Sequence, residues 1–192
     1  MNNKAFGHLD QLIAPGPRLP WIKRWLLDDV WSRENYEKVK PVEFLHRGES
    51  AVNTFEQLLA AAADRTYGEL LAGPGPAISV LESLSAPDTA VVVFDGLSLR
   101  EIPMVINLAE QSGLSPSRID ASLAAVPCET MDFIARELPC GRIAPSQLPG
   151  RKELKEKGIA AVYSGNYTQG IPGNHEDSAL LIWSSFPDHT YR

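Results

Sequence analysis

Apolar residues follow a helical pattern in the first part of the chain and form short continuous runs further on. Between Ser50 and Leu71 they recur three or four positions apart, which places them on one face and predicts a single long helix. Residues 90–94 are all apolar and mostly β-branched or aromatic, a pattern typical of a strand buried on both faces of a parallel sheet. Residues 102–111 return to helical spacing, with Pro103 tolerated in the first turn.

The remaining apolar segments extend this alternation of strands and helices. They predict a short helix over 78–84, a strand over 119–126, a helix over 131–138, a charged surface helix over 151–157, and strands over 160–163 and 179–183. Strands that alternate with helices indicate an α/β fold, a layered sheet with helices on both faces. Gly73-Pro74-Gly75-Pro76 interrupts regular structure, so we expect a helical N-terminal segment over 1–76 and an α/β domain over 77–192.

Three tryptophans, Trp21, Trp25 and Trp31, stand out in the N-terminal segment. Trp21 and Trp25 are four positions apart and therefore share a helix face. We expect this helix to pack on the body of the protein. The alternative is a stacking platform or a docking patch for a partner.

Composition and charge exclude several classes of protein. The 192 residues carry 18 Lys and Arg against 24 Asp and Glu, a net charge of −6, which argues against a generic grip on nucleic acid but leaves a locally basic groove open. No apolar run approaches the roughly 18–20 residues that cross a membrane, and the first residues lack the apolar core of a secretory signal. We therefore expect a cytoplasmic protein without membrane association. The two cysteines, Cys128 and Cys140, are expected to be buried, inert thiols.

Asp95 is the most informative single residue, because it directly follows the most hydrophobic strand. Ligands of open α/β sheets bind beyond the carboxyl ends of the strands. A carboxylate there can hold a divalent cation, and Gly96 lets the backbone turn sharply beside it. The alternatives are that Asp95-Gly96 is only a turn, or that Asp95 caps the following helix.

Thr130 is the second candidate. It lies between a predicted strand and a predicted helix, so its hydroxyl is expected near a helix N-terminus, which favours an anion such as phosphate. A hydroxyl at that point becomes a nucleophile if a metal or a base facilitates loss of its proton. The alternative is an ordinary threonine N-cap.

Together these segments resemble the PglZ-type domain of the alkaline phosphatase superfamily. Residues 91–98, Val-Val-Val-Phe-Asp-Gly-Leu-Ser, resemble the family's metal-ligand strand, and Pro127-Cys128-Glu129-Thr130 resembles its Pro-Ser-x-Thr turn. In the family, a helix with an arginine and a trailing glycine follows the turn, and Arg136 and Gly141 stand in that order here. The resemblance covers about half of the chain, and Cys128 replaces the usual serine.

The resemblance implies a metal-dependent phosphohydrolase or phosphodiesterase. Asp95 and Thr130 would ligate a divalent metal, zinc in first place and otherwise manganese or magnesium, and Thr130 would attack phosphorus to form a covalent intermediate. The substrate would be a phosphate ester. PglZ-type proteins are associated with bacterial phage defence, so protein partners in a defence or signalling assembly are expected. The alternative is an inactive or truncated module that acts through protein–protein interaction.

The metal ligands that complete the superfamily's site are only partly recognisable. The Asp-His-Gly turn found late in such domains does not occur in these 192 residues. Asp188 and His189, which follow the strand predicted over 179–183, are the nearest substitutes and are our further candidate ligands. We therefore expect an incomplete PglZ-like domain. It would be a piece of a longer protein, a short homologue that has lost catalysis, or a protein that recruits ligands from another subunit.

Overall fold

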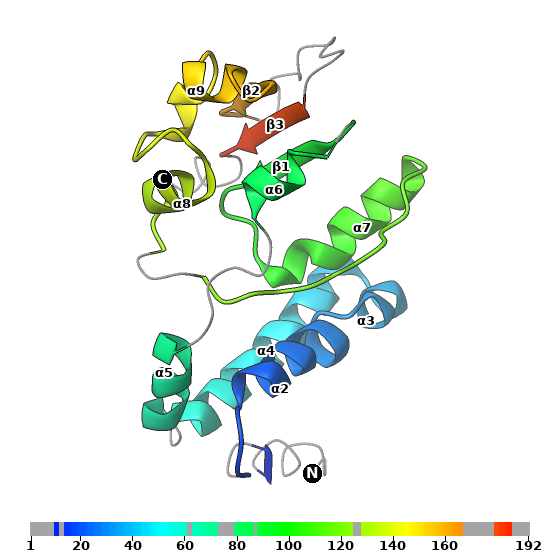
Figure 1. Cartoon of the computed structure of the whole chain (residues 1–192). Coiled ribbons are helices and arrows are strands. Elements are labelled where there is room, and N and C mark those ends of the chain that lie inside the picture. Colours follow the sequence, from blue (N-terminus) through cyan, green and yellow to red (C-terminus); the bar gives the residue numbers. More distant parts are fainter. Residues whose placement is uncertain are drawn as a thin grey trace. The chain divides into compact units, whose positions relative to one another are not determined.

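The computed structural model describes residues 10–11, 14–60, 63–72, 79–86, 88–124, 128–166 and 179–185. The chain divides into two compact units (Figure 1). The first comprises Met1–Gly73 and Ser98–Leu123, and the second comprises Pro74–Leu97 and Ala124–Arg192. This division differs from the expected boundary after residue 76, since residues 98–123 join the first unit.

The regular elements described in the first unit are all helical. They are α2 (Leu19–Arg24), the π-helical stretch η1 (Trp25–Val30), α3 (Arg33–Lys38), α4 (Pro41–Ala60), α5 (Ala63–Ala72), the 3-10 turn η2 (Leu99–Glu101) and α7 (Ile102–Gln111). The helix predicted over 102–111 is confirmed. The single helix expected over 50–71 is wrong in its bounds, because two helices, α4 and α5, cover this stretch and α4 begins earlier.

The early start of α4 has a local cause. Pro41 occupies the first helical position, where the missing N–H of proline costs no hydrogen bond. The first helical bond is then donated by the N–H of Phe44 to the carbonyl of Lys40, at 2.9 Å. Phe44 is 2% exposed, so the first turns of α4 contribute to the core of the first unit.

Tryptophan rings fill the core of the first unit. Trp25 and Trp31 are buried, and Trp21 stacks on Trp25 with ring centroids 6.2 Å apart and an interplanar angle of 11°. Phe55 of α4 packs against Trp21 and Trp25 at centroid distances of 5.6 and 4.5 Å. The expected packed helix is confirmed, and the buried rings of Trp25 and Trp31 are not available as a stacking platform.

A partly buried ion pair fixes the start of α2. The backbone N–H groups of Arg18 and Leu19 donate to Oε2 of Glu69, at 2.6 and 3.1 Å, and Nη1 of Arg18 donates to Oε1 at 2.8 Å. Helix N-termini leave their first N–H groups without intrahelical partners. Glu69 therefore satisfies these donors from α5 and joins the two helices.

The strand expected over 119–126 is wrong where the structure describes it, because residues 119–124 form no regular element. Asp120 instead pairs with Lys23 of α2 and with Arg118. The hydrogen bonds from Lys23 and then from Arg118 lower the pKa of Asp120. The segment is thus fixed to the first unit by charge pairing rather than by a sheet ladder.

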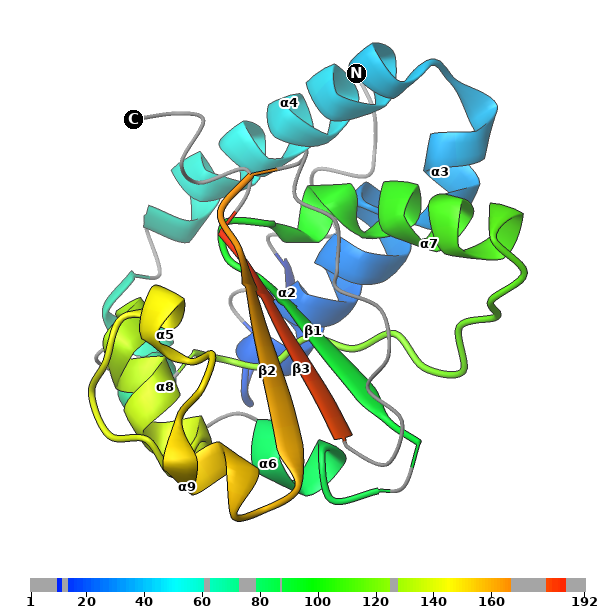
Figure 2. The same ribbon diagram turned by 90° about the horizontal axis from the view of Figure 1, so that it is seen from above.

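The second unit is a small parallel sheet with helices around it. Its elements are α6 (Val80–Ser83), β1 (Ala90–Phe94), α8 (Thr130–Glu137), the 3-10 turn η3 (Pro145–Gln147), α9 (Lys152–Lys155), β2 (Ile159–Ser164) and β3 (Ala179–Ser184). The α/β class, the three strands and the helix after Thr130 are thereby confirmed. The strand order is β1-β3-β2, with β3 between the other two (Figure 2).

Both pairings in the sheet are parallel, and their register sets which residues share a face. Val91 and Val93 of β1 are in register with Leu181 and Trp183 of β3. This face packs on α6, α8 and α9, whose most buried members include Ile134 at 0% exposure. The expectation that β1 is buried on both faces is wrong. The alternate residues of β1 are exposed, with Val92 at 44% and Phe94 at 47%, so only one face of this strand is covered.

Among the described residues, no helix combines the length and the apolar character that a membrane crossing requires.

Candidate functional site

Asp95 lies at the carboxyl end of β1, as the sequence predicts. Its backbone N–H donates to the carbonyl of Ser184 in β3, at 2.8 Å, which fixes the residue to the end of the sheet. Gly96 has a φ of +95°, a conformation that favours glycine, and it turns the chain away from the strand. The alternative in which Asp95 caps the next helix is not observed, since Ser98 is the N-cap of η2 and forms a capping box with Glu101.

Thr130 is the first residue of α8 and not its N-cap. Glu129 occupies the N-cap position with extended backbone, and no side chain caps this helix. The alternative that Thr130 is an ordinary N-cap is therefore wrong. The hydroxyl of Thr130 instead turns toward the second unit's sheet.

The hydroxyl of Thr130 meets the carboxylate of Asp95. Oγ1 of Thr130 donates to Oδ2 of Asp95 at 3.2 Å, and both residues are half-buried. The two residues are 35 positions apart, so the contact depends on the tertiary fold. It brings together a strand-end carboxylate and a helix N-terminal hydroxyl, which are the two candidates that the sequence singled out.

Arg142 places a positive charge at the same helix terminus. Its Nε donates to Oδ1 of Asp132 at 2.8 Å, and its Nη2 donates to Oε2 of Glu129 at 2.7 Å. The hydrogen bond that Arg142 donates to Asp132, together with the negative charges of both carboxylates, raises the pKa of the Arg142 guanidinium. Sequence reasoning missed this arginine. The available signal was its position directly after Gly141, where the chain can turn back along α8.

Oxygen donors for a cation are present, but the part of the chain that the structure describes contains no group of three or more His, Cys, Asp or Glu side chains able to hold a metal ion. Asp95 and Thr130 supply two hard oxygen atoms, the donor type that divalent cations such as magnesium and manganese accept. Asp188 and His189, the other expected ligands, lie outside the described residues.

The two cysteines have different environments. Cys128 is exposed, two positions before Thr130, whereas Cys140 is buried. Burial raises the pKa of the Cys140 thiol and keeps it protonated. The expectation of two buried thiols is confirmed for Cys140 and wrong for Cys128.

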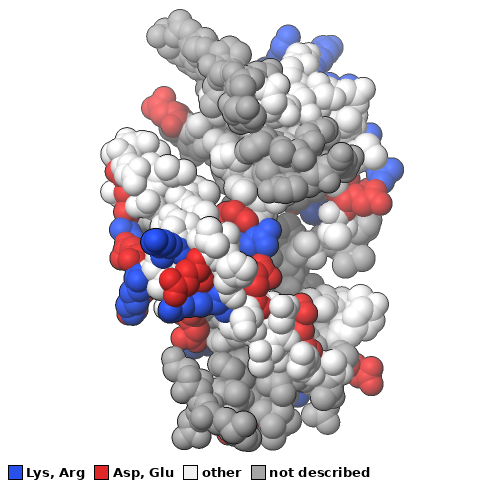
Figure 3. All heavy atoms as spheres, turned by 180° about the vertical axis from the view of Figure 1, so that it is seen from behind, with Lys and Arg blue, Asp and Glu red and all other residues white. Residues whose placement is uncertain are grey.

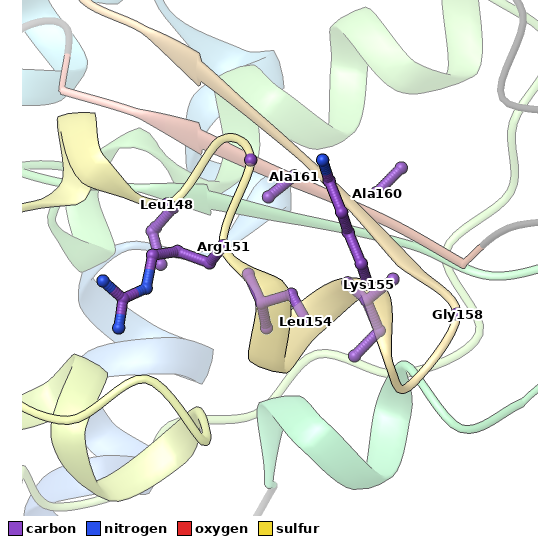
Figure 4. A pocket seen from close by; sticks show the side chains of 9 residues that line it. Leu148, Arg151, Leu154, Lys155, Gly158, Ala160 and Ala161 are labelled. Carbon is purple, nitrogen blue, oxygen red and sulfur yellow. The ribbon is translucent and has the colours of Figure 1, made fainter.

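A pocket of about 370 Å³ lies elsewhere in the second unit, against β2 and α9 (Figure 4). Its apolar wall includes Leu148 and Leu154, and Lys155 extends beside Ala160 and Ala161 of β2. Neither Asp95 nor Thr130 lines it. The lining pairs one apolar wall with basic side chains and offers no carboxylate or hydroxyl, so we place no chemistry there.

Acidic and basic side chains lie next to one another on the face drawn in Figure 3. Ion pairs of the first unit also join acidic to basic side chains: Arg33–Glu37, Arg33–Glu110, Lys38–Glu34, Arg47–Glu43 and Arg100–Glu49. Each basic residue in these pairs has its charge balanced by a neighbouring carboxylate. Such pairing does not build the clustered positive charge that a nucleic-acid backbone requires.

Comparison of this chain with known protein-family models, with curated proteins and with solved structures found no match.

Proposed function

We propose that this protein is a metal-dependent phosphoric ester hydrolase of the PglZ type, with Thr130 as its nucleophile. The observation that carries the proposal is the hydrogen bond from Thr130 Oγ1 to Asp95 Oδ2, at 3.2 Å. Each of the two short motifs that resemble one family supplies one of the two side chains in this hydrogen bond. In this proposal the described sheet is part of an alkaline phosphatase-like arrangement with helices on both faces.

The contact between Asp95 and Thr130 prepares the hydroxyl for attack. The hydroxyl of Thr130 already donates a hydrogen bond to a carboxylate oxygen of Asp95, which can accept the proton when Oγ1 becomes a nucleophile. Attack forms a bond between Oγ1 and phosphorus and breaks the bond to the leaving alcohol, which departs with its electron pair and takes up a proton. Water then hydrolyses the resulting phosphothreonine ester.

A divalent cation fits the donor set in part. Asp95 Oδ1 accepts no hydrogen bond from the described residues, so the carboxylate keeps one oxygen for a cation while the other faces Thr130. When bound, a divalent ion supplies charge stabilisation for the attacking and leaving oxygens. We propose zinc, or otherwise manganese or magnesium, with Asp188 and His189 as further ligands.

The biological setting remains part of the same proposal. The PglZ-type proteins that the sequence resembles are associated with bacterial phage defence, and related domains occur on signalling proteins. We therefore propose a cytoplasmic hydrolase that works within such an assembly, with a phosphate ester as its substrate.

The test is metal-dependent hydrolysis of a chromogenic phosphodiester by the full chain. Thr130→Val keeps the size of the side chain and removes the hydroxyl, so we expect the rate to fall by at least about a thousandfold. Thr130→Ser restores a hydroxyl and should recover part of the rate. Asp95→Asn should lose about 100- to 10,000-fold, because it removes the proton acceptor.

The matched control is Thr54→Val, since the hydroxyl of Thr54 is exposed and, among the described residues, bonds only to the carbonyl of Ser50 in α4. It should leave the rate unchanged. Circular dichroism of each variant checks that it is folded. Absence of turnover by the folded wild-type chain with zinc, manganese and magnesium would refute the proposal. Equal rates for wild type and Thr130→Val would refute Thr130 as the nucleophile.

A further inference from the structure

The guanidinium of Arg142 bridges two carboxylates at the start of α8. It donates to Glu129 at 2.7 Å and to both oxygens of Asp132, at 2.8 and 3.2 Å. Arginine holds a carboxylate with two parallel donors in a defined geometry, which a lysine ammonium does not reproduce. Because Glu129 is the N-cap of α8 and Asp132 lies in its first turn, the bridge spans the position of Thr130.

The chain reaches this position by reversing after α8. The helix ends at Glu137, and Gly141 then adopts a φ of +68°, a left-handed conformation that glycine adopts without strain. The reversal carries Arg142 back to the opposite end of the helix. An arginine close to the C-terminus of α8 in sequence thus acts at its N-terminus in space.

We propose that Arg142 is the positioning residue of the Asp95–Thr130 site, and that its charge allows an anionic ester to approach the Thr130 hydroxyl. This inference rests on the proposed hydrolase function and adds the charge class of its substrate and the residue that admits it. Arg142 holds the first turn of α8 in place, and with it Oγ1 of Thr130.

The negative charges around Thr130 explain why a positively charged side chain is needed there. Asp95, Glu129 and Asp132 each carry a carboxylate in or beside the turn that bears Thr130. Arg142 makes direct hydrogen bonds to two of these three groups. Without it, the helix terminus presents only negative side chains to an incoming phosphate ester.

A reporter of local charge is built into the chain at this point. Cys128 is exposed and precedes Glu129, while the other thiol, Cys140, is buried. The rate at which Cys128 reacts with a dicarboxylate aromatic disulfide, divided by its rate with a neutral dipyridyl disulfide, measures the potential at the site. The ratio cancels changes of thiol access or ionisation, because both reagents need the same thiolate.

Substitutions at Arg142 should change this ratio according to charge. We expect Arg142→Gln to lower it about threefold at low salt, with the effect fading above about 0.3 M salt. Arg142→Lys keeps the charge and should keep the ratio. The double variant Glu129→Gln, Arg142→Gln restores the local balance and should return the ratio toward that of wild type. Arg33→Gln is the matched control, since Arg33 also pairs with two carboxylates, but in the first unit.

Turnover supplies the second readout. Arg142→Gln should lower kcat/KM more for a dianionic phosphomonoester than for a monoanionic phosphodiester, and Arg142→Lys should lower kcat with little change in this preference. Loss of a residue with only a structural role would lower kcat/KM equally for both substrates. The thiol ratio needs no turnover, so the two proposals fail separately. A folded wild type without hydrolysis overturns the function, whereas an Arg142→Gln thiol ratio equal to that of wild type and Arg33→Gln overturns the role of Arg142.

Discussion

Replacing Gly48 with alanine tests how closely Trp31 packs on α4. Gly48 lies inside this helix, where alanine is ordinarily favoured by about 1 kcal/mol. A Cβ atom at Gly48, however, would lie 2.7 Å from Cε3 of Trp31 and closer still to two other ring atoms, Cζ3 and Cη2. Carbon atoms in contact are normally about 3.5–4.0 Å apart, so the ring or the helix must move.

Trp31 has little room to move. It is 7% exposed, and its ring meets Phe44 edge-on with centroids 5.5 Å apart. Overpacking a closed core costs about 1–3 kcal/mol, and three close approaches place this site at the upper end of that range. After subtracting the helical gain of about 1 kcal/mol, we expect Gly48→Ala to lower the free energy of unfolding of the first unit by about 2 kcal/mol. For a unit of this size that is a fall in Tm of about 8–16 °C.

Gly68→Ala is the matched control, because Gly68 lies inside α5 and a Cβ there would meet nothing within 4 Å. It should raise the free energy of unfolding by up to about 1 kcal/mol. Urea unfolding followed by tryptophan fluorescence measures both, since three of the four tryptophans belong to the first unit. If Gly48→Ala stabilises the protein as Gly68→Ala does, the packing of Trp31 on α4 is refuted. A Trp31→Leu background should remove most of the penalty, as a double-mutant cycle would show.

Three further predictions concern burial and charge. Partial burial opposes ionisation of Glu69, but its hydrogen bonds, led by that from Arg18, lower its pKa below the ordinary value of 4.5. The ionised form therefore stabilises the fold fully above about pH 4.5, and this stabilisation is lost as the pH falls through the lowered pKa. Glu69→Gln should lower the free energy of unfolding by about 1.5–3 kcal/mol at pH 7 and weaken its dependence on pH in the acid range. Ile134→Ala removes a side chain that is 0% exposed and should cost the second unit about 2–5 kcal/mol, measured by hydrogen exchange of its strand amides, and a cost below 1 kcal/mol would contradict the described core. A neutral thiol reagent should label Cys128 in the native protein and Cys140 only after unfolding, and mass spectrometry showing equal labelling of both would count against the burial of Cys140.

The sequence predicts three of the four expected strands and the later helices well, because their apolar patterns are local. The run at 90–94 and the spacing at 102–111 each fit one element type, and both elements occur with the expected bounds. The failures come from tertiary context. Whether each face of a strand is covered depends on what packs against it, so the exposure of Val92 and Phe94 could not be read from an apolar run.

The bounds of the first long helix failed for a more specific reason. The prediction begins at Ser50, whereas α4 begins at Pro41 and includes Gly48, a residue that is ordinarily unfavourable inside a helix. In the structure, Phe44, Gly48, Ala51 and Phe55 share one face of α4, and the glycine is needed where Trp31 approaches. A glycine required by a distant ring cannot be distinguished from a breaker by sequence spacing alone.

The candidate site was predictable in its parts but not in its assembly. Strand-end and helix-start positions identified Asp95 and Thr130 separately. Their hydrogen bond depends on the path of the chain between β1 and α8, which runs through the first unit. Arg142 was missed because its partners lie ten and thirteen positions before it, beyond the reach of helical periodicity.

The strand order β1-β3-β2 also determines when the sheet can assemble during synthesis. The central strand is the last of the three in sequence, and Ala90 in β1 pairs with Leu180 in β3. At about 5–20 residues per second, β1 leaves the ribosome on the order of ten seconds before its partner exists. During that interval both edges of β1 are open to other chains. Nascent-chain handling by chaperones therefore matters for the second unit, because its strands bond only across the sheet, whereas the helices of the first unit form hydrogen bonds four residues apart.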